Sequence, residues 1–255
     1  YGYKPPVYEE QNYVLGGLGL KKEILNPERD WTAFLPFGEQ QKRNIESYSC
    51  TEYGTLNCMV ILIRRLFLED NNYSERFVAI GAENDPDGND PNKVAEWVRH
   101  NGVIDEKELP FTDEIKTWQE FMLPKPLPSE LTKKGLNWLD NYEFGHEYVW
   151  RGNPSLKAKQ EALLEALQYS PIGISVTAWK QRNGLYYKDE DDQDNHWCVL
   201  VAGQKGKPWK IYDSYVDDDY LKELEWDYNF QTAKLFTLKL KAKKVCWLRR
   251  WWNII

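Results

Sequence analysis

The pattern of apolar and polar positions predicts several helices in the first half of the chain. The apolar run Cys58–Ile63 marks a long buried helix, which we expect over the stretch from Gln40 to about Asp70. Cys50 lies just before this run and is expected in the first turn of the helix. There, unpaired backbone amides and the positive end of the helix dipole favour a thiolate. Shorter helical segments are predicted at 77–80, with a cap at Ser74, and at 93–100, 129–139 and 155–169.

The second half of the chain reads as strands. Runs rich in β-branched and aromatic residues predict strands at 171–176, 197–202, 209–212 and 235–240. Three prolines, Pro124, Pro126 and Pro128, predict a rigid connector between the halves. We therefore expect an α+β protein with two lobes. The helical lobe covers about residues 40–125, and the β-rich lobe covers about 130–240 together with the N-terminal segment.

Composition and charge narrow the class of partner. Aromatic residues make up 15% of the 255 residues, which indicates an ordered chain with a substantial core. The formal net charge of −7 argues against nucleic acid as the main partner, because phosphate binding requires a basic face. No stretch has the length of a transmembrane helix or the pattern of a signal peptide. The chain begins at Tyr1, which is compatible with a processed form.

The cysteines and acidic motifs predict no metal or cofactor. The four cysteines are Cys50, Cys58, Cys198 and Cys246. They contain no CxxC pair, so a structural zinc site is not expected, and they do not form the pattern of a disulfide framework. This usage favours a reducing compartment, cytoplasmic or particle-associated. The loop from Asp85 to Glu96 half-matches a calcium loop, but its glycine, Gly88, is at the fourth position instead of the sixth. We interpret it as a loop that caps the next helix.

Three residues in order have the chemistry of a thiol hydrolase. Cys50 is followed after 146 residues by His196, at the head of a predicted strand, and His196 is followed after 17 residues by Asp213, at the end of the next strand. In such a set the histidine accepts the thiol proton, and the carboxylate holds the tautomer and orientation of the ring. An oxyanion also needs a donor near the thiol. The candidates are the amides just upstream of Cys50: Gln40, Gln41 and Asn44.

Several fragments in a shared order resemble the papain-like cysteine peptidases, over about residues 30–220. The resemblance implies a two-lobed fold, with a helical lobe and an antiparallel sheet or barrel lobe and the active-site cleft between them. It also implies cleavage of peptide or protein substrates with Cys50, His196 and Asp213 as the triad and Gln41 as the oxyanion donor. It places the loop around Gly88 beside the substrate backbone. The fragments are Leu35-Pro36 with Glu39-Gln40-Gln41, Ser74-Glu75-Arg76, Ala95–Val98 with Asn101-Gly102, Leu109-Pro110-Phe111, Ser170–Val176 and Asn195–Gly203.

The sequence also departs from the pattern of that family. The CGSCW motif around the nucleophile is reduced to Ser49-Cys50, the usual asparagine is Asp213, and the shielding tryptophan is Tyr215. The family's oxyanion glutamine is six residues before the cysteine, where this chain has Asn44. We favour Gln41 with a longer loop, and Gln40 is the next choice.

The sequence is also compatible with two other functions, and its C-terminal tail is a candidate binding surface. Transglutaminases and arylamine acetyltransferases share the Cys–His–Asp order, so an acyltransferase is an alternative. A catalytically inactive papain-like module that binds a partner is another. The basic and aromatic tail, residues 241–255, is expected either to pack on the protein or to dock on a membrane surface or another protein.

Overall fold

The computed structural model describes residues 2–7, 14–15, 22–215 and 220–241. Apart from Lys241, the predicted docking tail 241–255 lies outside the described residues. The helices are η1 (Thr32–Phe34), α1 (Cys50–Phe67), α2 (Glu75–Gly81), α3 (Pro91–Asn101), η2 (Glu106–Glu108), α4 (Trp118–Phe121), α5 (Ser129–Asn141) and α6 (Leu156–Ala166). The strands are β1 (Tyr142–Tyr148), β2 (Ile172–Val176), β3 (Lys180–Arg182), β4 (Leu185–Tyr187), β5 (His196–Ala202), β6 (Trp209–Tyr212), β7 (Leu221–Leu224) and β8 (Ala233–Leu240).

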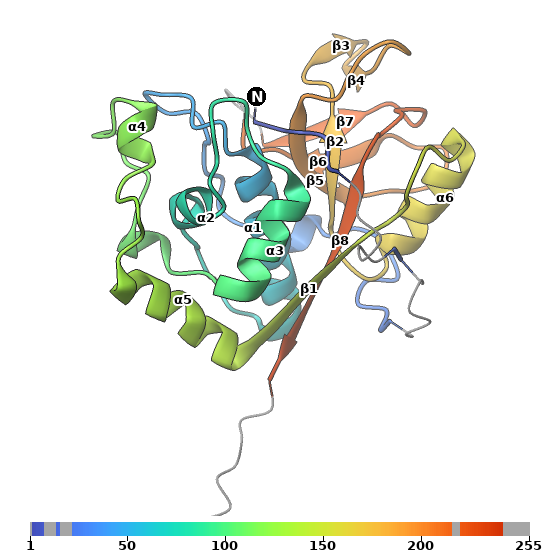
Figure 1. The fold of residues 1–255 in the computed structure, drawn as a ribbon. Coiled ribbons are helices and arrows are strands. Elements are labelled where there is room, and N and C mark those ends of the chain that lie inside the picture. The colour runs from blue at the N-terminus through green and yellow to red at the C-terminus, as the bar shows by residue number, and fades with distance from the viewer. Residues whose placement is uncertain (1, 8–13, 16–21, 216–219, 242–255) are drawn as a thin grey trace, which may run out of the picture.

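The strands form one sheet that packs against a group of helices. The strand order is β1-β8-β2-β5-β6-β7-β4-β3, and every neighbouring pair is antiparallel except β4 and β7. Helices α1 to α5 gather on the left of Figure 1 and the strands on the right, with α6 beyond the strands. The predicted α+β class with two lobes is confirmed. Our proposed boundary between the lobes stays a prediction.

Helix α1 lies at the centre of the molecule. It contacts β5, β8 and β2 of the sheet as well as α2 and α3. Its apolar run Cys58–Ile63 is buried in the same core as the inner faces of these strands. Burial of this run is the main driving force that holds helices and sheet together.

Cys50 lies in the first turn of α1 as expected, but the expected extension of this helix back to Gln40 was wrong. The helix begins at Cys50 and not near Gln40, because the preceding residues form a turn. The Ser47 hydroxyl donates to the carbonyl oxygen of Gln41 at 2.6 Å, and Tyr48 has a φ of 54°, which an α-helix does not allow. The helix ends where Leu68 adopts a left-handed conformation and donates its N–H to the Arg64 carbonyl.

Two predicted caps are confirmed. The Ser74 side chain accepts the N–H of Phe77 at the start of α2. Asp90 accepts the N–H of Asn92 at the start of α3, which supports the capping interpretation of the acidic loop. No helix in the described part of the chain has the length and apolar character needed to span a bilayer.

Candidate active site

His196 and Asp213 form a buried pair on neighbouring strands. His196 is the first residue of β5, Asp213 directly follows β6, and these strands pair antiparallel. Nε2 of His196 lies 2.6 Å from Oδ1 of Asp213, and both side chains are fully buried. The order of the strands therefore brings together two residues that the sequence separates by 17 positions. This contact is the arrangement required of a histidine and its orienting carboxylate.

Aromatic rings surround the imidazole. Trp179 and Tyr215 each present a ring at a steep angle to His196, with centroids 5.8 and 6.0 Å away. The Tyr215 N–H also donates to Oδ1 of Asp213 at 3.1 Å. These rings keep water from the His196–Asp213 bond, and low polarity around a hydrogen bond strengthens it. Tyr215 thus occupies the position that the resemblance assigns to a shielding tryptophan.

A lysine that the sequence analysis did not identify completes this group. Lys222 of β7 lies with Nζ 3.0 Å from Oδ2 of Asp213, and only 7% of Lys222 is exposed. Burial alone would raise the pKa of Asp213, but the charges of His196 and Lys222 outweigh it and lower that pKa. Asp213 is therefore an ionised carboxylate whose charge Lys222 offsets.

We predict that Lys222 and Asp213 are coupled in their contributions to the free energy of unfolding. Lys222→Met leaves a buried carboxylate without this ammonium, and we expect the free energy of unfolding to fall by about 3 kcal/mol. Adding Asp213→Asn removes the stranded charge and should restore most of the loss. Urea unfolding at pH 7 measures both variants. Lys210→Met on the exposed part of β6 is the control, with a change below about 0.5 kcal/mol. Equal losses in the single and double variants would contradict the coupling.

Cys50 lies next to the strand that carries His196. It is the first residue of α1, is fully buried, and packs in one cluster with Tyr3 and Trp197. Burial raises the pKa of the Cys50 thiol well above its usual range. The backbone N–H groups of Trp197 and Gly2 hydrogen-bond the sulfur and oppose this increase, whereas the carboxylate of Glu52 adds to it. Cys50 is thus held as a neutral thiol while it stays covered.

The segment Gly2–Lys4 covers the thiol. Tyr3 stacks on Trp197 at 5.8 Å, and its hydroxyl lies 3.0 Å from that of Thr232. The backbone pairs with Asn89 like a short parallel strand: the Asn89 N–H donates to the Gly2 carbonyl at 3.0 Å, and the Lys4 N–H donates to the Asn89 carbonyl at 2.9 Å. In Figure 1 this dark-blue segment, near the label N, runs between the helices and the strands.

The conformation of Gly88 and its lack of a side chain allow Gly2–Lys4 to pack closely against the loop that contains Gly88. Gly88 has a φ of 92°, and a Cβ there would lie about 2.1 Å from the carbonyl carbon of Gly2. A glycine is needed both for the conformation and for this close approach. The chain's own Gly2 is therefore the backbone that lies beside Gly88.

The three oxyanion candidates differ in their surroundings. Gln41 is fully buried, accepts the Ser214 hydroxyl through Oε1 at 3.2 Å, and donates its N–H to the Ser214 carbonyl at 3.1 Å. This ties Gln41 to the residue that follows Asp213. The side chain of Gln40 donates to the Tyr220 hydroxyl, and that of exposed Asn44 donates to the carbonyl of Asp113. The assignment of the oxyanion donor to Gln41 stays a proposal.

The other cysteines and the acidic loop that begins at Asp85 have contacts typical of structural residues. Cys58 and Cys198 are buried, and all three cysteines in the described part of the chain are free thiols. Asp85 of the half-matching calcium loop pairs with Lys4, and its Oδ1 accepts the N–H of Asp87 at 2.8 Å. This loop is therefore held by the protein's own hydrogen bonds.

Comparisons with known proteins show what the fold resembles. No protein-family model matches the sequence, and no curated protein is detectably similar to it. Solved structures do match. Xylellain, a cysteine protease from Xylella fastidiosa, is 18% identical with a TM-score of 0.61, over 95% of this chain and 96% of that one. The bromelain protease from Ananas comosus is 15% identical with a TM-score of 0.57, over 82% and 98%. A digestive procathepsin L from the larval midgut of Tenebrio molitor is 14% identical with a TM-score of 0.57, over 85% and 75%. At these identities the comparison concerns the fold alone, and this chain has the two-lobed fold of papain-like cysteine proteases.

Proposed function

We propose that the protein is a thiol peptidase that hydrolyses peptide bonds through an acyl-enzyme on Cys50. The observation that supports this most is the buried 2.6 Å contact between Nε2 of His196 and Oδ1 of Asp213. The residue after His196 is Trp197, and the backbone N–H of Trp197 faces the Cys50 sulfur. Helix α1, which begins at Cys50, packs on β5, which begins at His196, and this supports the proposed pairing of nucleophile and base. The papain-like fold of the solved neighbours agrees with this chemistry.

The proposed reaction has two steps. The imidazole of His196 accepts the thiol proton, and since Nε2 bonds to Asp213, this transfer uses Nδ1. The Cys50 sulfur attacks the substrate carbonyl, the C–N bond breaks, and the leaving amine takes the proton from the imidazolium. Water then hydrolyses the thioester with His196 as base, which releases the acid and restores the thiol. Gln41 is the proposed donor to the oxyanion of both tetrahedral intermediates.

Peptide cleavage tests this proposal directly. A mixed peptide library is incubated with the wild-type protein under reducing conditions, and new termini are identified by mass spectrometry. We expect cleavage by the wild type and none by Cys50→Ala. Cys58→Ala is the matched control, because Cys58 lies in the core of the same helix away from His196, and it should keep its activity. Cleavage that persists in Cys50→Ala would contradict the thiol mechanism.

The same reaction distinguishes the transferase alternative. Asp213, in place of the usual asparagine, is the feature that favours an acyltransferase. A soluble primary amine is added at increasing concentration, and the products are identified as acids or amides. A peptidase gives mostly acids, whereas dominant amide formation would assign the protein to acyl transfer.

One observation favours an inactive binding module. Cys50 is fully buried and its pKa is raised, so the covered state has no thiolate. An inert module predicts no cleavage of any peptide and a Cys50 that stays unreactive even after the covering segment is loosened. The peptidase proposal predicts the opposite on both measurements.

A further inference from the structure

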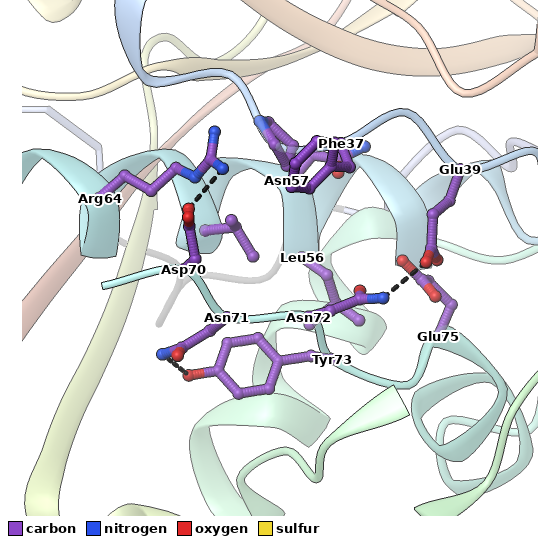
Figure 2. Close-up of a pocket in the computed structure, with 12 residues that line it drawn as sticks. Phe37, Glu39, Leu56, Asn57, Arg64, Asp70, Asn71, Asn72, Tyr73 and Glu75 are labelled. Atoms are coloured by element: carbon purple, nitrogen blue, oxygen red, sulfur yellow. Dashed lines mark hydrogen bonds and ion pairs between the residues drawn. The ribbon is translucent and has the colours of Figure 1, made fainter. Parts of the chain in front are cut away.

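Three glutamates that are far apart in the sequence meet at one point outside the candidate active site. Glu39 comes from the loop before α1, Glu75 is the first residue of α2, and Glu106 is the first residue of η2. One carboxylate oxygen from each lies within 4.8 Å of the other two. Figure 2 shows the carboxylates of Glu39 and Glu75 pointing toward each other.

The central carboxylate of this cluster is buried, and one of its oxygens has no hydrogen-bond partner in the described part of the chain. Glu75 is only 4% exposed, and no donor among the described residues reaches its Oε2. Among these residues, no lysine or arginine forms an ion pair with any of the three glutamates. The nearby Arg43 lies 3.6 Å from Asp113 instead. Three like charges without a counter-ion repel one another strongly in a buried place, so the arrangement needs a cation or bound protons.

Other groups hold the outer carboxylates in place. Oε1 of Glu39 accepts the Asn72 side chain at 2.6 Å, as the dashed line in Figure 2 shows. Oε1 of Glu106 accepts the N–H of Phe111 at 2.8 Å. Such hydrogen bonds orient carboxylates at metal sites. The cluster is therefore arranged before any ligand arrives.

A cavity beside the cluster gives access and supplies more oxygen atoms. Its volume is about 170 Å³, and it is lined by Glu39 and Glu75 together with the amide side chains of Asn57, Asn71 and Asn72. This space is sufficient for several waters. The rest of the lining includes Arg64, Phe37, Leu56 and Val60, so the oxygen ligands available to an ion lie on the side of the cavity where Glu39 and Glu75 meet.

We propose that Glu39, Glu75 and Glu106 bind one calcium ion. Calcium takes six to eight oxygen ligands at about 2.3–2.6 Å, so ligands on opposite sides of the ion lie up to about 5 Å apart. The spread of the three oxygens fits this span. Zinc prefers nitrogen and sulfur ligands, and magnesium needs shorter and stricter distances. The ion would connect the loop that carries Gln41 to α2 and η2, a role separate from the proposed catalysis.

Calcium titration of the metal-free protein tests the site. The chain is treated with EDTA, dialysed and titrated with calcium chloride in a calorimeter. We expect one ion per chain, and Glu75→Gln should weaken binding by at least about tenfold, since it removes the charge of the central ligand. Asp87→Asn is the matched control: it removes an acidic group from the half-matching calcium loop and should leave the affinity unchanged.

Thermal unfolding gives a second readout that does not require activity. At free calcium about a hundred times the dissociation constant, we expect the unfolding midpoint of the wild type to rise by about 5–10 °C above its value in EDTA. Glu39→Gln, a change in a partly exposed loop, should reduce this rise without preventing folding. Because neither readout uses catalysis, an inactive protein that binds calcium would overturn the proposed function and leave this site intact.

Three results would overturn the calcium site. The first is no heat of binding and no change in the midpoint at millimolar calcium. The second is a calcium response that Glu75→Gln and Glu39→Gln retain in full. The third is tighter binding of magnesium than of calcium. The first result, together with a higher midpoint of Glu75→Gln in EDTA, would show that the cluster is occupied by protons.

Discussion

His196→Ala is expected to lower kcat/KM for peptide cleavage by about a thousandfold and to remove the low-pH reactivity of Cys50. The imidazole is the only base in the proposed mechanism, and positioned bases contribute about 10²- to 10⁴-fold. An isolated thiol near pKa 8.5 is less than about 0.1% ionised at pH 5, whereas a thiolate paired with an imidazolium is ionised there. Even after the lower nucleophilicity of such a thiolate is considered, alkylation at pH 5 should slow by about thirtyfold.

Iodoacetamide labelling with peptide mapping measures this effect without a known substrate. The rate at Cys50 is followed from pH 4 to 9 in both proteins. Opening of the Gly2–Lys4 segment affects the labelling rates of the wild type and of His196→Ala by the same factor. The ratio of these two rates therefore measures the contribution of the imidazole. His100→Ala, an exposed histidine of α3, is the matched control and should change nothing. If His196→Ala labels at the wild-type rate throughout, His196 does not activate the thiol.

The helices of the fold were largely predictable, because their sequence patterns are local. The apolar run Cys58–Ile63 and the Ser74 cap were sufficient to place α1 and α2. The expected place of Cys50 in the first turn of α1 was correct, but the expected extension of the helix back to Gln40 was not. The start of the helix depends on the left-handed Tyr48 and on the contact of Gln41 with Ser214, which lies far away in the sequence. A helix boundary fixed by a distant residue leaves no local signal.

Four strands were missed for a related reason. β1 (Tyr142–Tyr148) contains Gly145 and two glutamates and has weak intrinsic preference for a strand. It forms because β8 pairs with it along its whole length. β3, β4 and β7 have only three or four residues each, so partner strands determine them as well.

The residues of the candidate site likewise fall into those with a local sequence signal and those that only the folded chain brings together. Cys50, His196 and Asp213 could be named as candidates because each lies at the end of an element with a clear pattern, and their catalytic roles stay a proposal. Lys222 was not found, since Leu221–Leu224 shows no alternation of apolar and polar residues, and only the structure shows that Lys222 points inward. The cluster of Glu39, Glu75 and Glu106 likewise exists only in the folded chain.

The state of the thiol depends on the segment that covers it. With Gly2–Lys4 in place, Cys50 is excluded from water, and burial is the largest factor that raises its pKa. Displacement of the segment would let water reach the sulfur and would lower this cost of ionisation. The same event exposes the Asn89 backbone and the face of Trp197, which Gly2 and Tyr3 otherwise occupy. Uncovering therefore changes both access to the thiol and its ionisation.

Tyr3→Ala is accordingly expected to raise the rate of Cys50 alkylation at pH 7 by about thirty- to a hundredfold. The substitution removes the stacking on Trp197 and the contact with the Thr232 hydroxyl, together worth about 2–3 kcal/mol of segment docking. When opening is fast, labelling follows the population of the open state, which increases tenfold for each 1.4 kcal/mol. The measurement is again iodoacetamide labelling at Cys50. Val7→Ala, three residues after the covering segment at a side chain that is 77% exposed, is the control and should label at the wild-type rate. An unchanged rate in folded Tyr3→Ala would mean that another part of the protein closes the site, because loosening a true cover must expose the thiol beneath it.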